Sequence, residues 1–394
     1  MAIGIVKNES TLALVPEATE GTYDAVSAGD GSEYIEVLAD GAELNLTREL
    51  LERDLLTDTV EKEAVRTSIA NVEGSIPVEL KTSSTEGDAP QSLDVLLRSL
   101  LGGKRQITSD QTSDDTTHTT TTIFFSDTSA FSVGDCVLIK DDTNGYAVRP
   151  ISAITTNTSI TLAIALDEVP PNEVVVAQVT TYYHDTANSI SFSAEHNLGS
   201  QAIQQQVNGL RCNSGSIENW SVGQIPTMTF GVQGLGLTRV DADASETPAF
   251  SDALPPVALS ACMWVDGNKL SYTEFGMSVE NTVSPIQDAC DADGRIASRI
   301  TDQTVSVNVN PYMDDSDLSK TWDKFNDNDD VSFFIYAYNP SSTAGEFANA
   351  VAIWIPQAKI TASPVADNDG IIAENLEIRA HRSSGNDSVF MSFI

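Results

Sequence analysis

Basic residues are scarce in this chain of 394 residues. Only 21 Lys and Arg stand against 57 Asp and Glu, which gives a formal net charge of −36. Proteins that grip nucleic acid do so through Lys and Arg, which displace counterions from the phosphates. The composition therefore argues against tight binding to DNA or to an anionic membrane surface.

Cysteine is also sparse. Cys136, Cys212, Cys262 and Cys290 lie 76, 50 and 28 residues apart, so no pair has the short spacing of a zinc knuckle or a redox CxxC motif. We expect these cysteines to be small buried residues in a protein made in a reducing compartment.

Long apolar runs and targeting signals are lacking as well. No uninterrupted apolar run exceeds six residues, whereas a membrane-spanning helix needs about 20. The stretch from Met1 to Lys7 lacks the basic patch and apolar core of a secretion signal. The sequence thus predicts a soluble protein, made in the cytoplasm, with no membrane partner.

Short strand-like segments dominate what the sequence does contain. Ser189 to Ala194, Thr227 to Val232, Thr304 to Val309 and Val331 to Tyr338 are β-branched or aromatic, often alternate, and are separated by turn residues. This pattern predicts a mainly β protein of the sandwich or barrel type.

Two helices are expected. The first is capped by Ser92, ended by Gly102, and carries a leucine stripe at helical spacing. That stripe consists of Leu93, Leu96, Leu97, Leu100 and Leu101. The second runs from Asp314 to Phe325 with acidic residues in its first turn. Both apolar stripes are expected to pack on a core.

The order strand, long polar stretch, strand, helix, strands occurs twice, at a spacing of roughly 230 residues. The two polar stretches are Arg48 to Ser68 and Asn281 to Ser298. We interpret this as a divergent internal duplication. The alternative is that any mostly β chain produces such a pattern by chance.

A further segment makes the first half longer than the second. Thr108 to Thr122 holds eight Thr in fifteen residues and is expected to be a linker or a long exposed edge. The short strands that follow, from Phe131 to Val179, predict a small inserted β-barrel of about 75 residues that hangs on the surface.

No catalytic or cofactor motif is visible. The four histidines are scattered, and GVQGLG at 231–236 fails the dinucleotide-binding spacing. We therefore expect no enzyme, no cofactor and no catalytic residue.

Two acidic stretches have some of the oxygen ligands of a calcium site. Asp291 to Gly294 resembles part of a calcium loop, but Ala289 and Ile300 stand where the EF-hand needs oxygen ligands. Asn326 to Asp330 is expected to be a solvated turn, with adventitious calcium left open. No metal site is predicted.

Several phrases stand in a characteristic order along the chain: Glu17 to Tyr23 (EATEGTY), Arg66 to Leu80, the leucine helix, Phe131 to Leu138 (FSVGDCVL), Ser191 to His196, Val207 to Cys212, Val265 to Lys269, Met277 to Asn281 and Gly370 to Ala380. In this order they resemble the major tail tube proteins of long, flexible-tailed bacteriophages, and among them the longer type with two tube domains in one chain.

The resemblance implies an architecture. It consists of two tandem tube β-sandwich or barrel domains, each with a flanking α-helix, plus the small inserted all-β domain. The first tube domain would comprise residues 1–104 and 181–245, the insert 105–180, and the second tube domain 246–394.

It also implies a function. The chain would be a structural virion protein, located in the tail, that forms stacked rings around a channel for DNA. Three chains would give six tube domains per ring, with a hexamer as the alternative. Other partners would be the tape measure and tail terminator proteins. DNA would pass without specific binding, because an acidic wall repels phosphates.

The two polar stretches, as loops Arg48 to Arg66 and Asn281 to Arg299, are expected to contact the next ring. Acidic residues together with Arg48, Arg53, Arg66, Arg295 and Arg299 would form ion pairs there. The alternatives are ordinary solvated loops or, for Leu50 to Val65, a surface helix.

A different functional class also stays open. A β-rich decoration or fibre protein could use the insert to bind glycans on the host surface. An acidic extracellular hydrolase would need a secretion signal.

Overall fold

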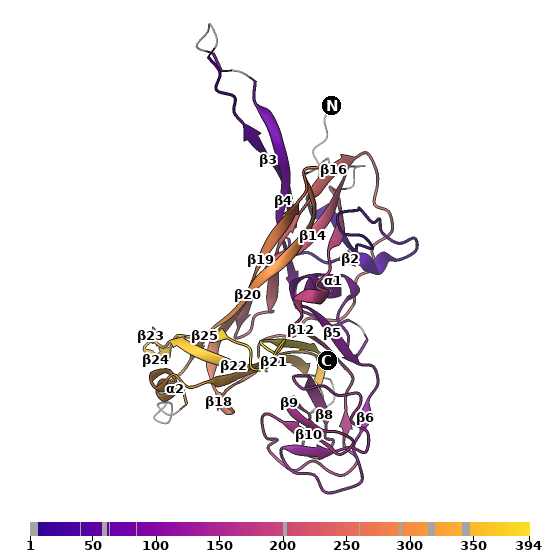
Figure 1. The fold of residues 1–394 in the computed structure, drawn as a ribbon. Coiled ribbons are helices and arrows are strands. Elements are labelled where there is room, and N and C mark those ends of the chain that lie inside the picture. Colours follow the sequence, from indigo (N-terminus) through magenta and orange to yellow (C-terminus); the bar gives the residue numbers. More distant parts are fainter. Residues whose placement is uncertain are drawn as a thin grey trace.

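A computed structural model describes residues 7–39, 41–56, 61–62, 64–83, 85–199, 203–259, 261–290, 294–313, 320–340 and 347–394. The fold is mainly β, as the alternating segments predicted. A long body of inclined strands carries a projecting hairpin at one end and two smaller lobes at the other (Figure 1).

The strands of the first half are β1 Thr11–Pro16, β2 Tyr34–Ile35, β3 Glu43–Leu51, β4 Arg66–Glu79, β5 Gly102–Ile107, β6 Gln111–Thr112, β7 Thr122–Phe124, β8 Cys136–Lys140, β9 Ala147–Thr155, β10 Ser159–Leu162, β11 Val175–Val176, β12 Val179–His184, β13 Phe192–Asn197, β14 Gln204–Ser221, β15 Thr227–Gly234 and β16 Gly236–Val240. Those of the second half are β17 Cys262–Val265, β18 Asn268–Leu270, β19 Tyr272–Gln287, β20 Arg295–Pro311, β21 Val331–Pro340, β22 Phe347–Ala362, β23 Val365–Asn368, β24 Ile371–Glu374, β25 Leu376–Ala380 and β26 Phe390–Phe393. The α-helices are α1 Gln91–Leu100 and α2 Trp322–Asp327.

One hydrogen-bonded sheet joins both halves of the chain. Its strands follow the order β3, β4, β15, β14, β19, β20, β25, β22, β21, β17 and β18. The junction is β14 with β19, where Ser214 pairs with Glu280 and Ser221 with Glu274. The N-terminal part of β14 belongs to a second group of strands, because it pairs with β13 and β16.

The two polar stretches are partly strand, and the expectation of long loops is wrong for residues 48–51, 66–68, 281–287 and 295–298. β3 and β4 form one long antiparallel hairpin, and β19 and β20 form another. We call these the first arm (β3–β4) and the second arm (β19–β20). Polar residues occur in strands here because each arm supplies its own backbone hydrogen-bond partners, so no buried face is required. The surface helix considered for Leu50 to Val65 is also excluded where the structure describes it, since Leu50 and Leu51 lie in β3.

The two arms share one pairing register. In the first arm Leu51 pairs with Arg66, and in the second Ser284 pairs with Arg299, so both strands are offset by the same number (284 − 51 = 299 − 66 = 233). All eight residue pairs of the first arm recur in the second at this offset, including the irregularity after Arg48. The paired parts of the two arms are therefore equivalent in register, although β19 and β20 extend further than β3 and β4.

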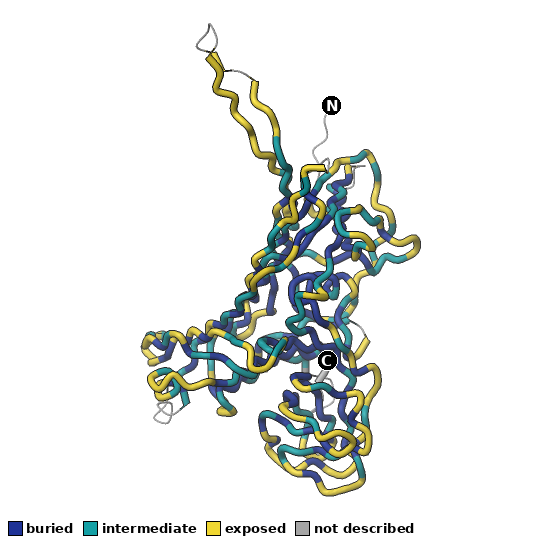
Figure 2. The backbone as a smooth tube through the Cα atoms, viewed as in Figure 1, coloured by how far each residue is buried: buried dark blue, intermediate teal, exposed yellow. Residues whose placement is uncertain are grey.

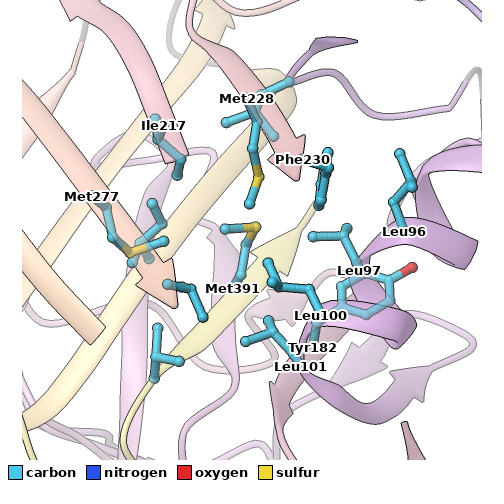
Figure 3. Close-up of a cluster of buried hydrophobic side chains, with 14 of the residues drawn as sticks. Leu96, Leu97, Leu100, Leu101, Tyr182, Ile217, Met228, Phe230, Met277 and Met391 are labelled. Atoms are coloured by element: carbon cyan, nitrogen blue, oxygen red, sulfur yellow. The ribbon is translucent and has the colours of Figure 1, made fainter. Parts of the chain in front are cut away.

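Helix α1 packs the predicted leucine stripe into the main core. Leu96, Leu97, Leu100 and Leu101 face Met228 and neighbouring apolar side chains of the sheet (Figure 3). The helix begins at Gln91 with Pro90 at the N-cap, so Ser92 is not the cap and is instead buried in the first turn.

Helix α2 is shorter than expected. It comprises Trp322 to Asp327, and Asp314 to Ser319 lie outside the described residues. It ends at Asn328, whose φ of 55° is the left-handed conformation typical of helix C-termini. Its Trp322 is exposed and Phe325 is partly buried against the main core.

The inserted segment contains a six-stranded sheet in the order β6, β11, β8, β9, β10 and β7. The Thr-rich stretch is part of this unit and is not a linker: β6 pairs with β11, and Ser113 and His118 are buried. The outer side of the insert is exposed (Figure 2), while its inner side shares an apolar cluster with Trp264, Phe334 and Trp354 of the second half.

Candidate functional site

The continuous sheet has one apolar and one polar face. Core residues such as Ile76, Ile217 and Val307 alternate along their strands with polar residues such as Ser75, Ser216 and Ser306. Because side chains alternate sides along a strand, the polar residues of neighbouring strands line up on the face opposite the core. This polar face runs without a break from β3 through β14 and β19 to β25.

Most charged residues on the polar face are acidic. Arg379 also lies on this face, with its guanidinium 3.5 Å from Thr304 Oγ1, and Arg211 and Arg299 lie opposite Gln233 and Ser284 of neighbouring strands. The carboxylates of the polar face are Glu43, Glu73, Glu79, Glu218, Glu274, Glu280, Asp302 and Glu377. Such a face repels phosphate groups.

The outer part of the first arm extends away from the body and is exposed, whereas its base, with Leu44, Val72 and Ile76, is buried in the core (Figure 2). Arg48, Arg53 and Arg66 are exposed on it. Its exposed apolar residues are Leu50, Leu51, Leu55, Leu56 and Val65. An exposed run of leucines beside arginines is typical of an interaction surface.

The second arm, by contrast, lies against the first half of the same chain. Glu20 accepts hydrogen bonds from the backbone N–H of Ser298 at 2.6 Å and from Arg299. Arg295 is buried, and its Nη1 donates to Asn71 Oδ1 at 3.2 Å. Two of the five predicted contact residues, Arg295 and Arg299, therefore hold the second arm to its own chain.

Glu20 has a second basic partner on the sheet. Arg211 of β14 donates from Nη2 to Glu20 Oε2 at 2.9 Å and from Nε to Oε1 at 3.3 Å. Burial favours the neutral acid, but the hydrogen bonds from Arg211, Ser298 and Arg299 outweigh it, so the pKa of Glu20 lies below its ordinary value. Glu20 is ionised at neutral pH and joins the N-terminal loop, β14 and the second arm.

Glu17 anchors the same loop. Its carboxylate accepts from the N–H groups of Gly21 at 2.8 Å and Gly209 at 2.6 Å, and from the hydroxyls of Ser191 and Ser193. Sequence reasoning found the phrase EATEGTY but assigned no role to its two glutamates. The signal was present in that phrase, whereas the partners lie in distant segments.

The described histidines give no catalytic arrangement. The closest to one is His118, whose Nε2 lies 3.0 Å from the buried Ser113 Oγ. Its Nδ1 accepts a hydrogen bond from the N–H of Phe124 at 3.4 Å, so in the neutral ring the proton sits on Nε2. Nε2 then donates to the Ser113 hydroxyl and has no lone pair with which to accept the hydroxyl proton. Burial also lowers the pKa of His118. This pair serves packing, since a general base would need a free ring nitrogen facing the serine.

Among the residues that the structure describes, no cluster of His, Cys, Asp or Glu could hold a metal ion. Asp291 to Asp293, in the stretch that resembles part of a calcium loop, lie outside the described residues. In the second acidic stretch, Asp330 pairs with Lys359 at 2.9 Å and with His381 at 3.0 Å. No helix in the described part of the chain is long and apolar enough to cross a membrane.

A polar, mostly acidic sheet face and a projecting arm agree with the tail tube resemblance of the sequence. A search of curated proteins gives no match to this chain. A family model described as phage tail tube protein matches residues 7–380, so the chain belongs to the phage tail tube protein family and is a structural protein of the virion tail.

Proposed function

We propose that this chain assembles into rings that stack into a hollow tube, and that DNA passes through this tube into the host. The observation that carries the proposal is the continuous sheet with its polar, acidic face. A sheet that ends in open edges tends to pair with further strands, and closure into a ring satisfies those edges.

The acidic face would line the channel. A wall rich in Lys and Arg would hold DNA through counterion release, whereas carboxylates repel it and let it slide. The same sheet buries its other face under α1, so in this arrangement the helix lies on the outer side of the ring.

We further propose two tube domains per chain, residues 1–104 with 181–245 and residues 246–394, with residues 105–180 inserted. The shared register of the two arms supports this division. Three chains would then supply six domains per ring, and six chains are the alternative. Tape measure and tail terminator proteins would bind the inside and the end of such a tube.

The first arm would contact the next ring, with Arg48, Arg53 and Arg66 pairing with its carboxylates. In this proposal the second arm makes fewer contacts between rings than the first arm, because Arg295 and Arg299 already have partners within the chain.

Negative-stain electron microscopy of the purified protein tests the main proposal. Stacked rings or tubes with a central channel are expected, and discrete monomers at high concentration would contradict it. The mass of an isolated ring tests the stoichiometry, with three chains expected and six chains contradicting the two-domain assignment.

A further inference from the structure

We infer that β3 of one chain pairs, antiparallel, with the outer edge of β22 and β23 of a second copy, in the register that β19 adopts on β14 within the chain. The inference rests on the proposed ring assembly and assigns its contact to two specific strands. It follows from comparing equivalent edges of the two halves.

Strands β14 and β19 form the junction between the two halves of the chain. Here β14 presents the edge and β19 docks on it, with Ser214 opposite Glu280, Gly215 opposite Val279 and Ile217 opposite Met277. Under the offset of 233, β19 corresponds to β3, so the residues of β3 equivalent to Glu280, Val279 and Met277 are Thr47, Leu46 and Leu44.

The strand of the second half that corresponds to β14 is β22. In the first half Arg211 pairs with Gln233 and Ser214 with Gly231, across an irregularity after Cys212. In the second half Lys359 pairs with Arg379 and Ala362 with Glu377, across an irregularity at the same place, after Ile360.

The neighbouring strands agree with this correspondence. β15 pairs with β4 in the first half, and β25 pairs with β20 in the second half. Gln233 lies opposite Glu73, and Arg379 lies opposite Ser306. Ser306 of β20 follows Glu73 of β4 by the same 233 residues. β22 is therefore equivalent to β14 at an offset of 148 (359 − 211 = 362 − 214 = 148). β23 continues β22 in the same direction after Pro364.

Both edges are open within the described strands. β3 pairs on one side with β4, and β22 beyond Ala358 pairs on one side with β25. The two edges lie at opposite ends of the molecule, with β3 in the projecting arm and β22 beside the far lobe (Figure 1). They cannot meet in one chain, so a second copy must supply the partner.

Val365 provides an independent sign of the missing strand. Its equivalent in the first half is Ile217 (365 − 217 = 148), which is 2% exposed between Met228 and Met277. Val365 itself is 70% exposed. The predicted partner opposite Val365 is Leu44, the equivalent of Met277, so docking of β3 restores the contact that the first half already has.

Pro364 does not block this edge. Its carbonyl accepts from the N–H of Asn375, on the β24 side. In an antiparallel ladder the N–H and C=O of one residue point to the same side, so the missing N–H of Pro364 also faces β24. The outer edge uses the groups of Ser363 and Val365.

Disulfide trapping tests the register. In a Cys290→Ser background, Thr47→Cys and Ala362→Cys fall directly opposite each other, at a Cβ separation of about 4.5–5.5 Å that a disulfide can bridge after a small adjustment. Oxidised tubes of the double variant are expected to yield covalent dimers and trimers on non-reducing gels. A mixture of the two single variants should yield dimers and nothing larger.

The matched control is Thr47→Cys with Ser363→Cys, because a slip of one residue moves the side chain to the other face of the strand. Tubes that form normally but link equally in both pairs, or in neither, would overturn the inference and leave the proposed function standing. Absence of tubes from the unmodified chain would overturn both.

A second variant avoids any effect of oxidation. Val365→Asp places a charge in the predicted junction and should raise the concentration needed for assembly at least tenfold, with the unfolding of the monomer unchanged. Ile371→Asp is the control, since Ile371 is also exposed but lies on β24, away from the predicted pair. Equal assembly of the two variants would contradict the proposed contact.

Discussion

Glu20 and Arg211 lie 191 residues apart in the chain, yet Arg211 Nη2 is 2.9 Å from Glu20 Oε2. Both side chains are largely buried, and Glu20 also accepts hydrogen bonds from the backbone N–H of Ser298 and from the guanidinium of Arg299. One carboxylate thus joins the N-terminal loop, the central strand β14 and the second arm. The placement of that arm depends on the charge of Glu20.

Glu20→Gln is expected to lower the free energy of unfolding by about 2 kcal/mol at neutral pH, because it removes the charge from a largely buried hydrogen-bonded pair. The wild type should also lose stability as the pH falls below the ordinary Glu value of 4.5. The pKa of Glu20 is lowered in the folded state, so its contribution is complete above that value and declines as the pH falls through the folded pKa.

Urea unfolding between pH 7 and pH 3 measures both effects. The difference between the wild type and Glu20→Gln should shrink toward acid pH. Glu52→Gln is the control, since the ion pair of Glu52 with Lys62 is solvent-exposed and contributes little. A constant difference at every pH would contradict the role assigned to Glu20.

Gly215→Ala is expected to destabilise the fold by about 1–3 kcal/mol through overpacking. A Cβ at this position would lie 2.5 Å from Leu100 Cδ2 of α1 and 2.7 Å from Met228 Cε, so these buried side chains would have to shift within the core. Thermal unfolding measures the change.

Gly276→Ala is the matched control on the neighbouring strand β19. Its Cβ would meet the Ile217 carbonyl oxygen at 3.7 Å, an ordinary contact, so a change within about 0.5 kcal/mol is expected. Similar losses of stability in the two variants would contradict the idea that α1 packs closely on the sheet because Gly215 has no side chain.

Arg53→Glu combined with Arg66→Glu is expected to shorten the tubes strongly while rings still form. Both side chains are exposed on the first arm, so the free energy of unfolding of the monomer should change by less than about 0.5 kcal/mol. Tube lengths are measured by electron microscopy. The control pair, Arg239→Glu with Arg382→Glu, makes the same change of charge elsewhere on the surface, and equally short tubes from it would point to a general charge effect.

Lysines on the polar face should make the tube retain DNA. Glu73, Glu218 and Glu280 are exposed on this face, and their replacement by Lys adds six positive charge units per chain where phosphates would pass. A short DNA duplex should then sediment with the tubes at low salt, which it should not do with the wild type.

The control for that experiment places three lysines at Asp127, Asp167 and Glu168, which are exposed on the insert. Equal retention of DNA by both triple variants would place the polar face outside the channel. Retention that disappears at high salt is expected, because the attraction is electrostatic.

The amino-acid sequence alone was enough to predict the β character, the leucine face of α1 and the tail tube resemblance. These are local properties: alternation in Thr304 to Val309, helical spacing from Leu93 to Leu101, and short phrases such as EATEGTY can each be read without knowing what they contact. The scarcity of Lys and Arg likewise predicted a strongly acidic surface, although not where on the fold the carboxylates lie.

The folded structure was needed to show that the polar stretches contribute to hairpin arms, that β14 pairs with β19, and that Glu20 contacts Arg211. Segments such as Asn281 to Gln287 and Arg295 to Arg299 have no strong strand preference, and they become strands because each satisfies the backbone groups of the other. The register of two strands is set by the pairing of distant residues, which no local pattern contains. The sequence therefore predicted that the halves repeat at about 230 residues, and the pairing of the arms fixed the offset at 233.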